Sequence, residues 1–279
     1  MRFLPLLILA LCGAGASRGT PDESWRYLGR TPPGEERAVF LPGIAERIAI
    51  SDDGREIYFN DSARGISVHR YADGRWEEPA SVFAQCGAAA LSPDGRTITV
   101  QNALGNILAA DRAGAGWTVP RVWLNPPERL HYFQQTSGGA GYATRMGASP
   151  RGIQGTICAV SGTGTAVQLD PLPPSINSGD NGVDFFVARD DSFIIFVVHP
   201  GGANGDLNIA FRKPDGTWSR PLNLGPQVNR DTTWEWGPFV SPDGRFLFYT
   251  AASSAKDVAV YWIRIDGILE RLRRAALAP

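Results

Sequence analysis

Five residues have side chains whose types and spacing could support chemistry: Glu46, Asp184, Trp234, Glu235 and Trp236. Carboxylates around one opening can serve as acid, base and pKa modulator in glycoside cleavage, provided that two of them lie about 5 to 9.5 Å apart. The simpler interpretation, which we favour, is that Asp184 and Glu235 bind backbone amides or water. The two indoles beside Glu235 suit a sugar-stacking or peptide-binding surface, because a flat ring covers apolar groups while a carboxylate orients hydroxyls.

Other residue types that often carry catalysis or metal binding are scattered. The three histidines, His69, His131 and His199, are far apart along the chain and lack metal-ligand spacing. A Gly-x-Ser-x-Gly match at 15–19 follows no strand pattern, and no phosphate-binding Gly-x-x-x-x-Gly-Lys is present. The sequence therefore predicts no catalytic motif, no metal site and no cofactor.

The balance of charge argues against a polyanionic partner. The 279 residues include 27 Lys and Arg against 28 Asp and Glu, a formal net charge of −1. A chain so balanced creates no field that would gather phosphates or an anionic membrane surface. Nucleic acid is therefore not an expected partner.

The first sixteen residues have the form of an export signal. The apolar run 3–11 follows a basic residue and leads to Ala14-Gly15-Ala16, a small-x-small sequence that signal peptidase accepts. We expect cleavage after Ala16, because so short a run does not anchor a chain in a bilayer. Lipoprotein processing at Cys12 is the alternative, but Leu11 is bulky where a small residue is needed. No later segment is apolar for long enough to span a membrane, so a periplasmic or secreted protein is predicted.

Signal cleavage would leave two cysteines, Cys86 and Cys158. A single pair is too sparse for a disulfide framework. Both lie in apolar or small-residue stretches that are typical of strands. We therefore favour two separate buried thiols, with one bridge between them as the alternative.

A repeated turn organises the chain. Nearly the same tetrapeptide occurs at 51–54, 92–95 and 241–244, as Ser-Asp-Asp-Gly once and Ser-Pro-Asp-Gly twice, and a degenerate copy occupies 188–191. Serine first, proline second and glycine fourth are typical of a type I turn. Short β-rich runs flank each copy, which therefore predicts a β-hairpin.

A second sequence feature repeats with the same spacing as this turn. Tryptophans that end a later turn occur at Trp76, Trp117 and Trp218, and we interpret them as packing residues. The step from Asp53 to Asp94 is 41 residues, and so is the step from Trp76 to Trp117. A period in the forties with four short strands per unit predicts a β-propeller, because one such sheet buries both faces only when stacked against neighbours.

The repeat predicts five four-stranded antiparallel blades. Their expected ranges are 44–84, 85–127, 128–175, 176–229 and 230–265. The third range has lost the turn sequence, which leaves six blades as the alternative.

The two ends of the chain are expected to share the last blade. The final unit lacks a fourth strand, and the stretch 37–41 is the candidate to supply it. The apolar spacing of Ile268, Leu269 and Leu272 then predicts a short helix, with Asp266 as its cap. The expected organisation is a signal peptide (1–16), a leader (17–36), a single all-β propeller (37–265) and a C-terminal helix or tail (266–279).

The repeat also resembles a known family. The pattern Ser-Pro-Asp-Gly-Arg-x-Leu-x-Phe-x-Ser/Thr, seen most fully at 241–250, is similar to the repeat of the WD40-like propeller proteins, also called PD40 proteins. The segments 215–225 and 27–34 resemble the same family, and TolB-like proteins carry related repeats. The resemblance covers residues 25–274 and is weakest over 128–175. It implies a propeller that is usually exported, and no single activity.

A propeller places its innermost strands around a central channel, so a site is expected where those strands begin. Glu46, Asp184 and the segment 234–236 stand at that point of blades one, four and five, which resembles the acidic residue often found there in the family. The first hypothesis is a monomeric, non-catalytic binding module for an envelope or extracellular protein or a glycan. The alternative is a carbohydrate-active hydrolase that uses the channel carboxylates.

Overall fold

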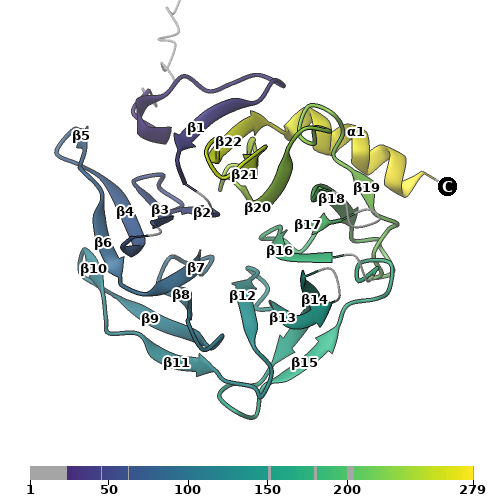
Figure 1. Cartoon of the computed structure of the whole chain (residues 1–279), viewed down its shortest axis with the longest axis horizontal. Coiled ribbons are helices and arrows are strands. Elements are labelled where there is room, and N and C mark those ends of the chain that lie inside the picture. Colours follow the sequence, from purple (N-terminus) through teal and green to yellow (C-terminus); the bar gives the residue numbers. More distant parts are fainter. Residues whose placement is uncertain are drawn as a thin grey trace, which may run out of the picture.

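The structure is a ring of five antiparallel sheets around a central axis (Figure 1). It is a computed structural model, and it describes residues 24–44, 46–61, 63–149, 152–178, 181–199 and 204–278. Each sheet has four strand positions; in four sheets the first strand in sequence lies nearest the axis, and in the fifth the N-terminal strand is outermost. The fold is therefore the five-bladed β-propeller that the repeat predicted. The predicted signal peptide, its cleavage site after Ala16, and Cys12 lie outside the described residues.

In blades 1 to 4 the strands follow one another along the chain, whereas blade 5 also includes the N-terminal strand. Blade 1 contains β2 (Ile48–Ile50), β3 (Glu56–Asp61), β4 (Gly65–Ala72), β5 (Arg75–Trp76) and β6 (Ala80–Phe83). Blade 2 contains β7 (Cys86–Leu91), β8 (Thr97–Asn102), β9 (Ile107–Ala113), β10 (Gly116–Trp117) and β11 (Arg121–Leu124). Blade 3 contains β12 (Leu130–Gln135), β13 (Gly141–Ser149), β14 (Gly152–Ser161) and β15 (Gln168–Pro171). Blade 4 contains β16 (Asn181–Val187), β17 (Phe193–Val198), β18 (Asp206–Phe211) and β19 (Leu222–Asn223). Blade 5 contains β20 (Trp234–Val240), β21 (Phe246–Ala252), β22 (Ala259–Arg264) and β1 (Ala38–Pro42).

The repeated turns hold each hairpin in the same way. In blade 1 the N–H of Gly54 donates to the carbonyl of Ser51 (2.8 Å), and the Ser51 hydroxyl accepts the N–H of Glu56 (2.9 Å). Both bonds recur in the two Ser-Pro-Asp-Gly copies. Gly54 has a φ of +74°, a left-handed conformation that favours glycine. In the degenerate copy Asp191 takes this place with a φ of +60°, which aspartate tolerates.

The N-terminal strand closes the ring as predicted. β1 pairs antiparallel with β22, and Ala38 stands opposite Trp262. Phe40 is fully buried, with its ring centre 4.9 Å from that of Phe248 and 5.2 Å from that of Trp262. The leader before this strand also packs, because Tyr27 in the 3₁₀ turn η1 (Tyr27–Gly29) is buried and its hydroxyl donates to Asp243 (3.2 Å). The first and the last strand of the described chain therefore belong to one blade.

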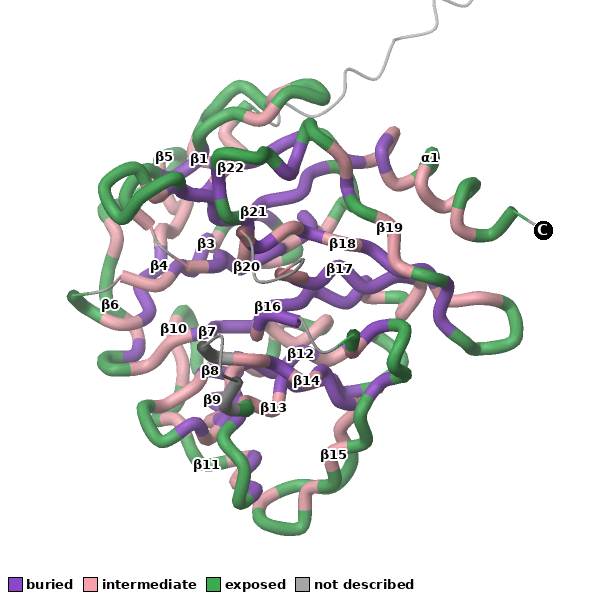
Figure 2. The backbone as a smooth tube through the Cα atoms, turned by 45° about the vertical axis from the view of Figure 1, so that its right-hand side comes forward, coloured by how far each residue is buried: buried purple, intermediate pink, exposed green. Residues whose placement is uncertain are grey.

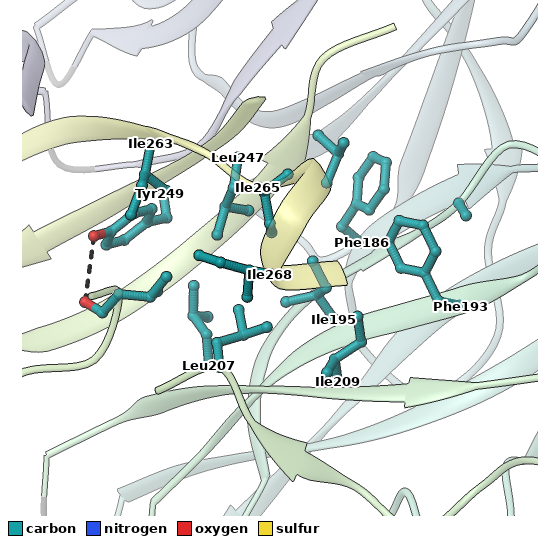
Figure 3. Packing of buried hydrophobic residues seen from close by; sticks show 14 of the residues in the cluster. Phe186, Phe193, Ile195, Leu207, Ile209, Leu247, Tyr249, Ile263, Ile265 and Ile268 are labelled. Atoms are coloured by element: carbon teal, nitrogen blue, oxygen red, sulfur yellow. Dashed lines mark hydrogen bonds between the residues drawn. The ribbon is translucent and has the colours of Figure 1, made fainter. Parts of the chain in front are cut away.

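A C-terminal helix, α1 (Asp266–Leu277), follows the last strand. The predicted cap was wrong: Ile265 is the N-cap, and Asp266 is already the first helical residue. Ile265 still donates its N–H to the carbonyl of Arg245, so the sheet pattern runs up to the start of the helix. Ile268 is buried in the apolar cluster between blades 4 and 5 (Figure 3). In the described part of the chain no helix is long and apolar enough to cross a membrane.

The core lies between neighbouring blades, where buried strand residues form the interior of the ring (Figure 2). The repeated tryptophans are packing residues, as predicted: Trp117 and Trp218 each lie under an arginine guanidinium, at 3.8 and 3.9 Å from the ring centre. Trp76 packs in the cluster that also buries Phe40. The two cysteines are free thiols, as favoured, but only Cys158 is buried and Cys86 is half-buried; burial raises the pKa of each.

Candidate functional site

Arg47 crosses the central channel at the face where the innermost strands begin, here called the entry face. It lies directly before β2 in blade 1, yet its side chain reaches blades 3 and 4. Its guanidinium donates to Asp184 Oδ1 (2.5 Å) and to the carbonyl of Phe185 (3.1 Å), and it lies 3.4 Å from the centre of the Tyr132 ring. Arg47 is 4% exposed, and a charge so buried persists only when it is paired. The contacts therefore link blades that are not neighbours in the ring (Figure 1).

Asp184, at the start of blade 4, is held by two side chains. Besides Arg47 it faces His131, whose Nε2 lies 3.3 Å from Asp184 Oδ1. Burial alone would raise the pKa of Asp184, but the Arg47 charge and the His131 hydrogen bond outweigh it and hold the pKa well below the ordinary range. The sequence did not predict these two partners, which come from blades 1 and 3.

Glu46, directly before Arg47 in the chain, lies near enough to Asp184 for the two carboxylates to interact electrostatically. Its backbone carbonyl accepts the hydroxyl of Thr250 (3.1 Å). Its side chain lies toward blade 2, where a Cβ built on Gly87 would be 3.9 Å from Glu46 Oε2 and 3.7 Å from Asn60 Oδ1. Burial, and then the negative charge of Asp184, raise the pKa of Glu46.

Glu235, in the innermost strand of blade 5, is completely buried. Its Oε1 accepts from Arg37 Nη1 (3.3 Å) and from the hydroxyl of Thr233, whereas no described residue donates to its Oε2. Burial raises the pKa of Glu235 to about 7. Its backbone N–H donates to the carbonyl of Gly205 (2.8 Å), which joins blade 5 to blade 4. An arginine and a threonine side chain hold the carboxylate, and the sequence did not predict these partners.

An open pocket of about 340 Å³ lies between blades 4 and 5 at the entry face. It is lined by Gly182, Val183, Asp184, Val197, His199, Gly205, Trp234, Glu235 and Trp236. Trp234 and Trp236 are two positions apart in β20, and alternation along a strand turns their side chains away from that of Glu235. Trp234 is 58% exposed. The indoles thus form the open wall of the pocket, and the Glu235 carboxylate lies behind it.

His199 fits against two glycines of the same pocket. A Cβ at Gly182 would lie 3.1 Å from His199 Nε2, and a Cβ at Gly205 would lie 2.9 Å from His199 Cε1. A Cβ at Gly205 would force the imidazole to shift, and a Cβ at Gly182 would press closely against it. The glycines therefore admit the imidazole as a third flat ring in the wall.

The structure brings together four of the five residues that the sequence singled out. Asp184, Trp234, Glu235 and Trp236 share the pocket, and Glu46 does not line it. In the described residues no group of three or more His, Cys, Asp and Glu is placed to hold a metal ion. Two of the main groups of the site were not predicted from the sequence: Arg47 and the wall formed with His199.

The channel below Arg47 is filled by side chains. Phe239 lies edge-on to Phe186 with ring centres 5.8 Å apart. Beside them a cavity of about 30 Å³ remains, lined in part by Tyr132 and Gln134. This space suits ordered water rather than a ligand. A ligand on the entry face would therefore occupy the pocket beside the channel.

A second hollow, of about 500 Å³, lies between blades 1 and 2 on the opposite face. Its best-placed charges are paired with each other: Glu56 accepts from Arg112 (2.7 Å) and from Arg70 (3.2 Å). Arg112 also stacks over the repeated Trp117. These contacts therefore form part of the interface between blades 1 and 2.

Comparison with protein-family models and with curated proteins finds no match. Solved structures that resemble the chain are propellers of low identity. A protein assigned as TolB from Agrobacterium tumefaciens is 18% identical with a TM-score of 0.48, covering 80% of this chain and 77% of that one. Periplasmic gluconolactonase PpgL of Pseudomonas aeruginosa is 14% identical with a TM-score of 0.45, covering 77% and 70%. A protein assigned as a 6-phosphogluconolactonase from Bacteroides uniformis is 14% identical with a TM-score of 0.42, covering 72% of this chain, and the chain spans 62% of its length. Identities this low bear on the fold alone.

Proposed function

We propose that this propeller is a non-catalytic binding module whose ligand occupies the pocket between blades 4 and 5. The observation that carries the proposal is Trp234, whose indole is 58% exposed although it stands on an innermost strand. An exposed indole in a concave wall is a typical anchor for a ligand. With Trp236 and His199 it lines a pocket of about 340 Å³, within the range of small-ligand sites.

The state of the carboxylates supports binding over catalysis. A general acid or base must come within hydrogen-bond reach of the reacting atom. Asp184 is already occupied by Arg47 and His131, and Glu235 is fully buried behind the indoles. Glu46 lies outside the pocket lining.

The test replaces the exposed indole. Trp234→Ala should weaken binding at least about tenfold, because truncation of an anchor aromatic removes most of its contact area. Leu104→Ala is the matched control, since Leu104 is 74% exposed and does not line the pocket. Binding is measured by NMR titration with short peptides and neutral oligosaccharides, following the indole N–H signals. Equal affinity of both variants for every ligand would place the binding site elsewhere.

A hydrolase that uses the channel carboxylates is the second candidate, and one observation favours it. The pKa of Glu235, raised to about 7 by burial, would suit a general acid at neutral pH. The wild type would then cleave aryl glycosides, and Glu235→Gln would lower kcat at least about a hundredfold. A wild type without turnover on a broad aryl-glycoside panel removes this candidate.

We further propose that the protein is exported and is related to the WD40-like (PD40) propellers. The support is the apolar run 3–11 before Ala16 and the repeated turn with its tryptophan. The mature protein purified from the cell envelope or medium should begin at Ser17. Intact mass and N-terminal sequencing measure this directly, and a retained Met1 would contradict export by this route.

A further inference from the structure

We infer that the pocket between blades 4 and 5 receives an uncharged apolar side chain of a partner polypeptide, together with one backbone group of that polypeptide. The inference rests on the proposed function and narrows the ligand from protein or glycan to protein. Three features of the wall support it: its aromatic surface, the partners that its polar groups already have, and the pairing of its charges.

The polar groups of the wall are largely occupied. The Trp234 indole N–H donates to the side-chain oxygen of Asn204, and Trp236 has an interaction partner of its own. The backbone N–H of Glu235 donates to Gly205 (2.8 Å), and Asp184 is engaged by Arg47 and His131. Among the described lining residues, His199 is the polar side chain left without a hydrogen bond. The unpaired Oε2 of Glu235 is completely buried behind the strand, so the wall offers a ligand two indoles and one imidazole.

The groups that this wall offers would satisfy the hydroxyls of a sugar poorly. A pyranose carries several hydroxyl groups, and each one buried without a partner costs about 1–3 kcal/mol. One imidazole provides at most two of the bonds that such a ring would lose from water. An apolar side chain loses no hydrogen bonds to water when it enters the pocket. The peptide group next to it can use the single donor or acceptor that His199 supplies. A peptide segment is therefore the better complement.

The charges near the pocket argue for an uncharged side chain. Asp184 is neutralised by Arg47, and the Glu235 carboxylate faces Arg37 on the far side of the strand. A charged group entering the pocket would lose hydration without gaining an unpaired counter-charge. Trp234 and Trp236 instead present apolar ring faces to it.

The experiment uses pentapeptide amides of the form acetyl-Gly-Gly-X-Gly-Gly, with X as Phe, Leu, Lys or Asp. Cellopentaose and chitopentaose are the glycan probes. NMR titration of the full mature chain should give the highest affinity for Phe or Leu, with Lys, Asp and both glycans at least about tenfold weaker. Trp234→Ala should lose the Phe peptide, and Leu104→Ala should retain it.

His199→Phe tests the single polar contact. It keeps a flat ring against Gly182 and Gly205 but removes the hydrogen bond, so the Phe peptide should bind several-fold more weakly. Unchanged affinity would show that His199 only fills space, and would overturn the backbone contact. A Trp234-dependent preference for a glycan or for the Lys peptide would overturn the ligand class while leaving the pocket as the binding site. If no probe depends on Trp234, both the inference and the proposed function fail.

Discussion

Glu235 is a buried carboxyl whose folded-state pKa, about 7, lies above the ordinary value of 4.5. The fold therefore favours its protonated form: the stabilisation is complete below pH 4.5 and is lost as the pH rises through 7. The shift corresponds to about 3 kcal/mol, at about 1.4 kcal/mol per pH unit. Glu235→Gln removes the ionisation, so the variant should gain stability relative to wild type between pH 5 and pH 8. Urea unfolding at the two pH values measures this.

Glu78→Gln, at an exposed position, is the control for this prediction. Parallel pH curves of stability for wild type and Glu235→Gln would contradict the burial of a titrating carboxyl at this position.

At this scale the sequence predicted part of the site. Trp234 and Trp236 were separable from the repeated tryptophans because they fall outside the repeat position, and the pocket contains both. Arg47 was missed, although it adjoins Glu46 at the start of an innermost strand, because its partners come from blades 3 and 4. His199 was missed for the same kind of reason: only the pairing of β17 with its neighbours places it against Gly182 and Gly205.

At the scale of elements, β1 is the segment on which ring closure depends. Its Phe40 is fully buried against Phe248 and Trp262. Phe40→Ala should cost about 3–5 kcal/mol of unfolding free energy, because it leaves a cavity in the shared blade. Val39→Ala is the matched control on the same strand, since Val39 is 42% exposed and should cost less than about 1 kcal/mol. Urea unfolding of both variants measures the difference, and similar losses would mean that the strand does not carry the closure.

The repeat predicted the blades because local chemistry repeats with them. Even the third blade, which lacks the Ser-Pro-Asp-Gly turn, keeps the hairpin through Gly139, whose N–H donates to Thr136 (3.0 Å) with a φ of +86°. Because aspartate is a typical N-cap residue, the sequence placed the first helical residue of α1 one position too late. The burial of Ile265 and its sheet hydrogen bond decide that boundary, and neither is visible in a local pattern.

At the scale of the whole molecule, two ion pairs join blade 1 to blade 4 across the ring. Arg47 pairs with Asp184 at one end of β2, and Asp52 pairs with Arg189 at the other, with the signs reversed. The first pair is buried, with side chains 3% and 11% exposed, and the second is open, with 53% and 32%. Since these blades are not neighbours, the pairs brace the ring across its axis, and they should differ sharply in strength.

Arg47→Met should cost about 3–5 kcal/mol at pH 7, because it leaves the Asp184 carboxylate buried without its cation. Asp52→Asn should cost less than about 1 kcal/mol, as is usual for an exposed pair. The folded-state pKa of Asp184 is lowered, so the stability it contributes is present above its ordinary value of 3.8 and is lost as the pH falls toward the folded pKa. The deficit of Arg47→Met should therefore shrink below about pH 4 as Asp184 takes up a proton. Urea unfolding at pH 7 and pH 3 measures both effects. A similar loss from the two substitutions, or a deficit of Arg47→Met that does not change with pH, would mean that the buried pair does not brace the ring.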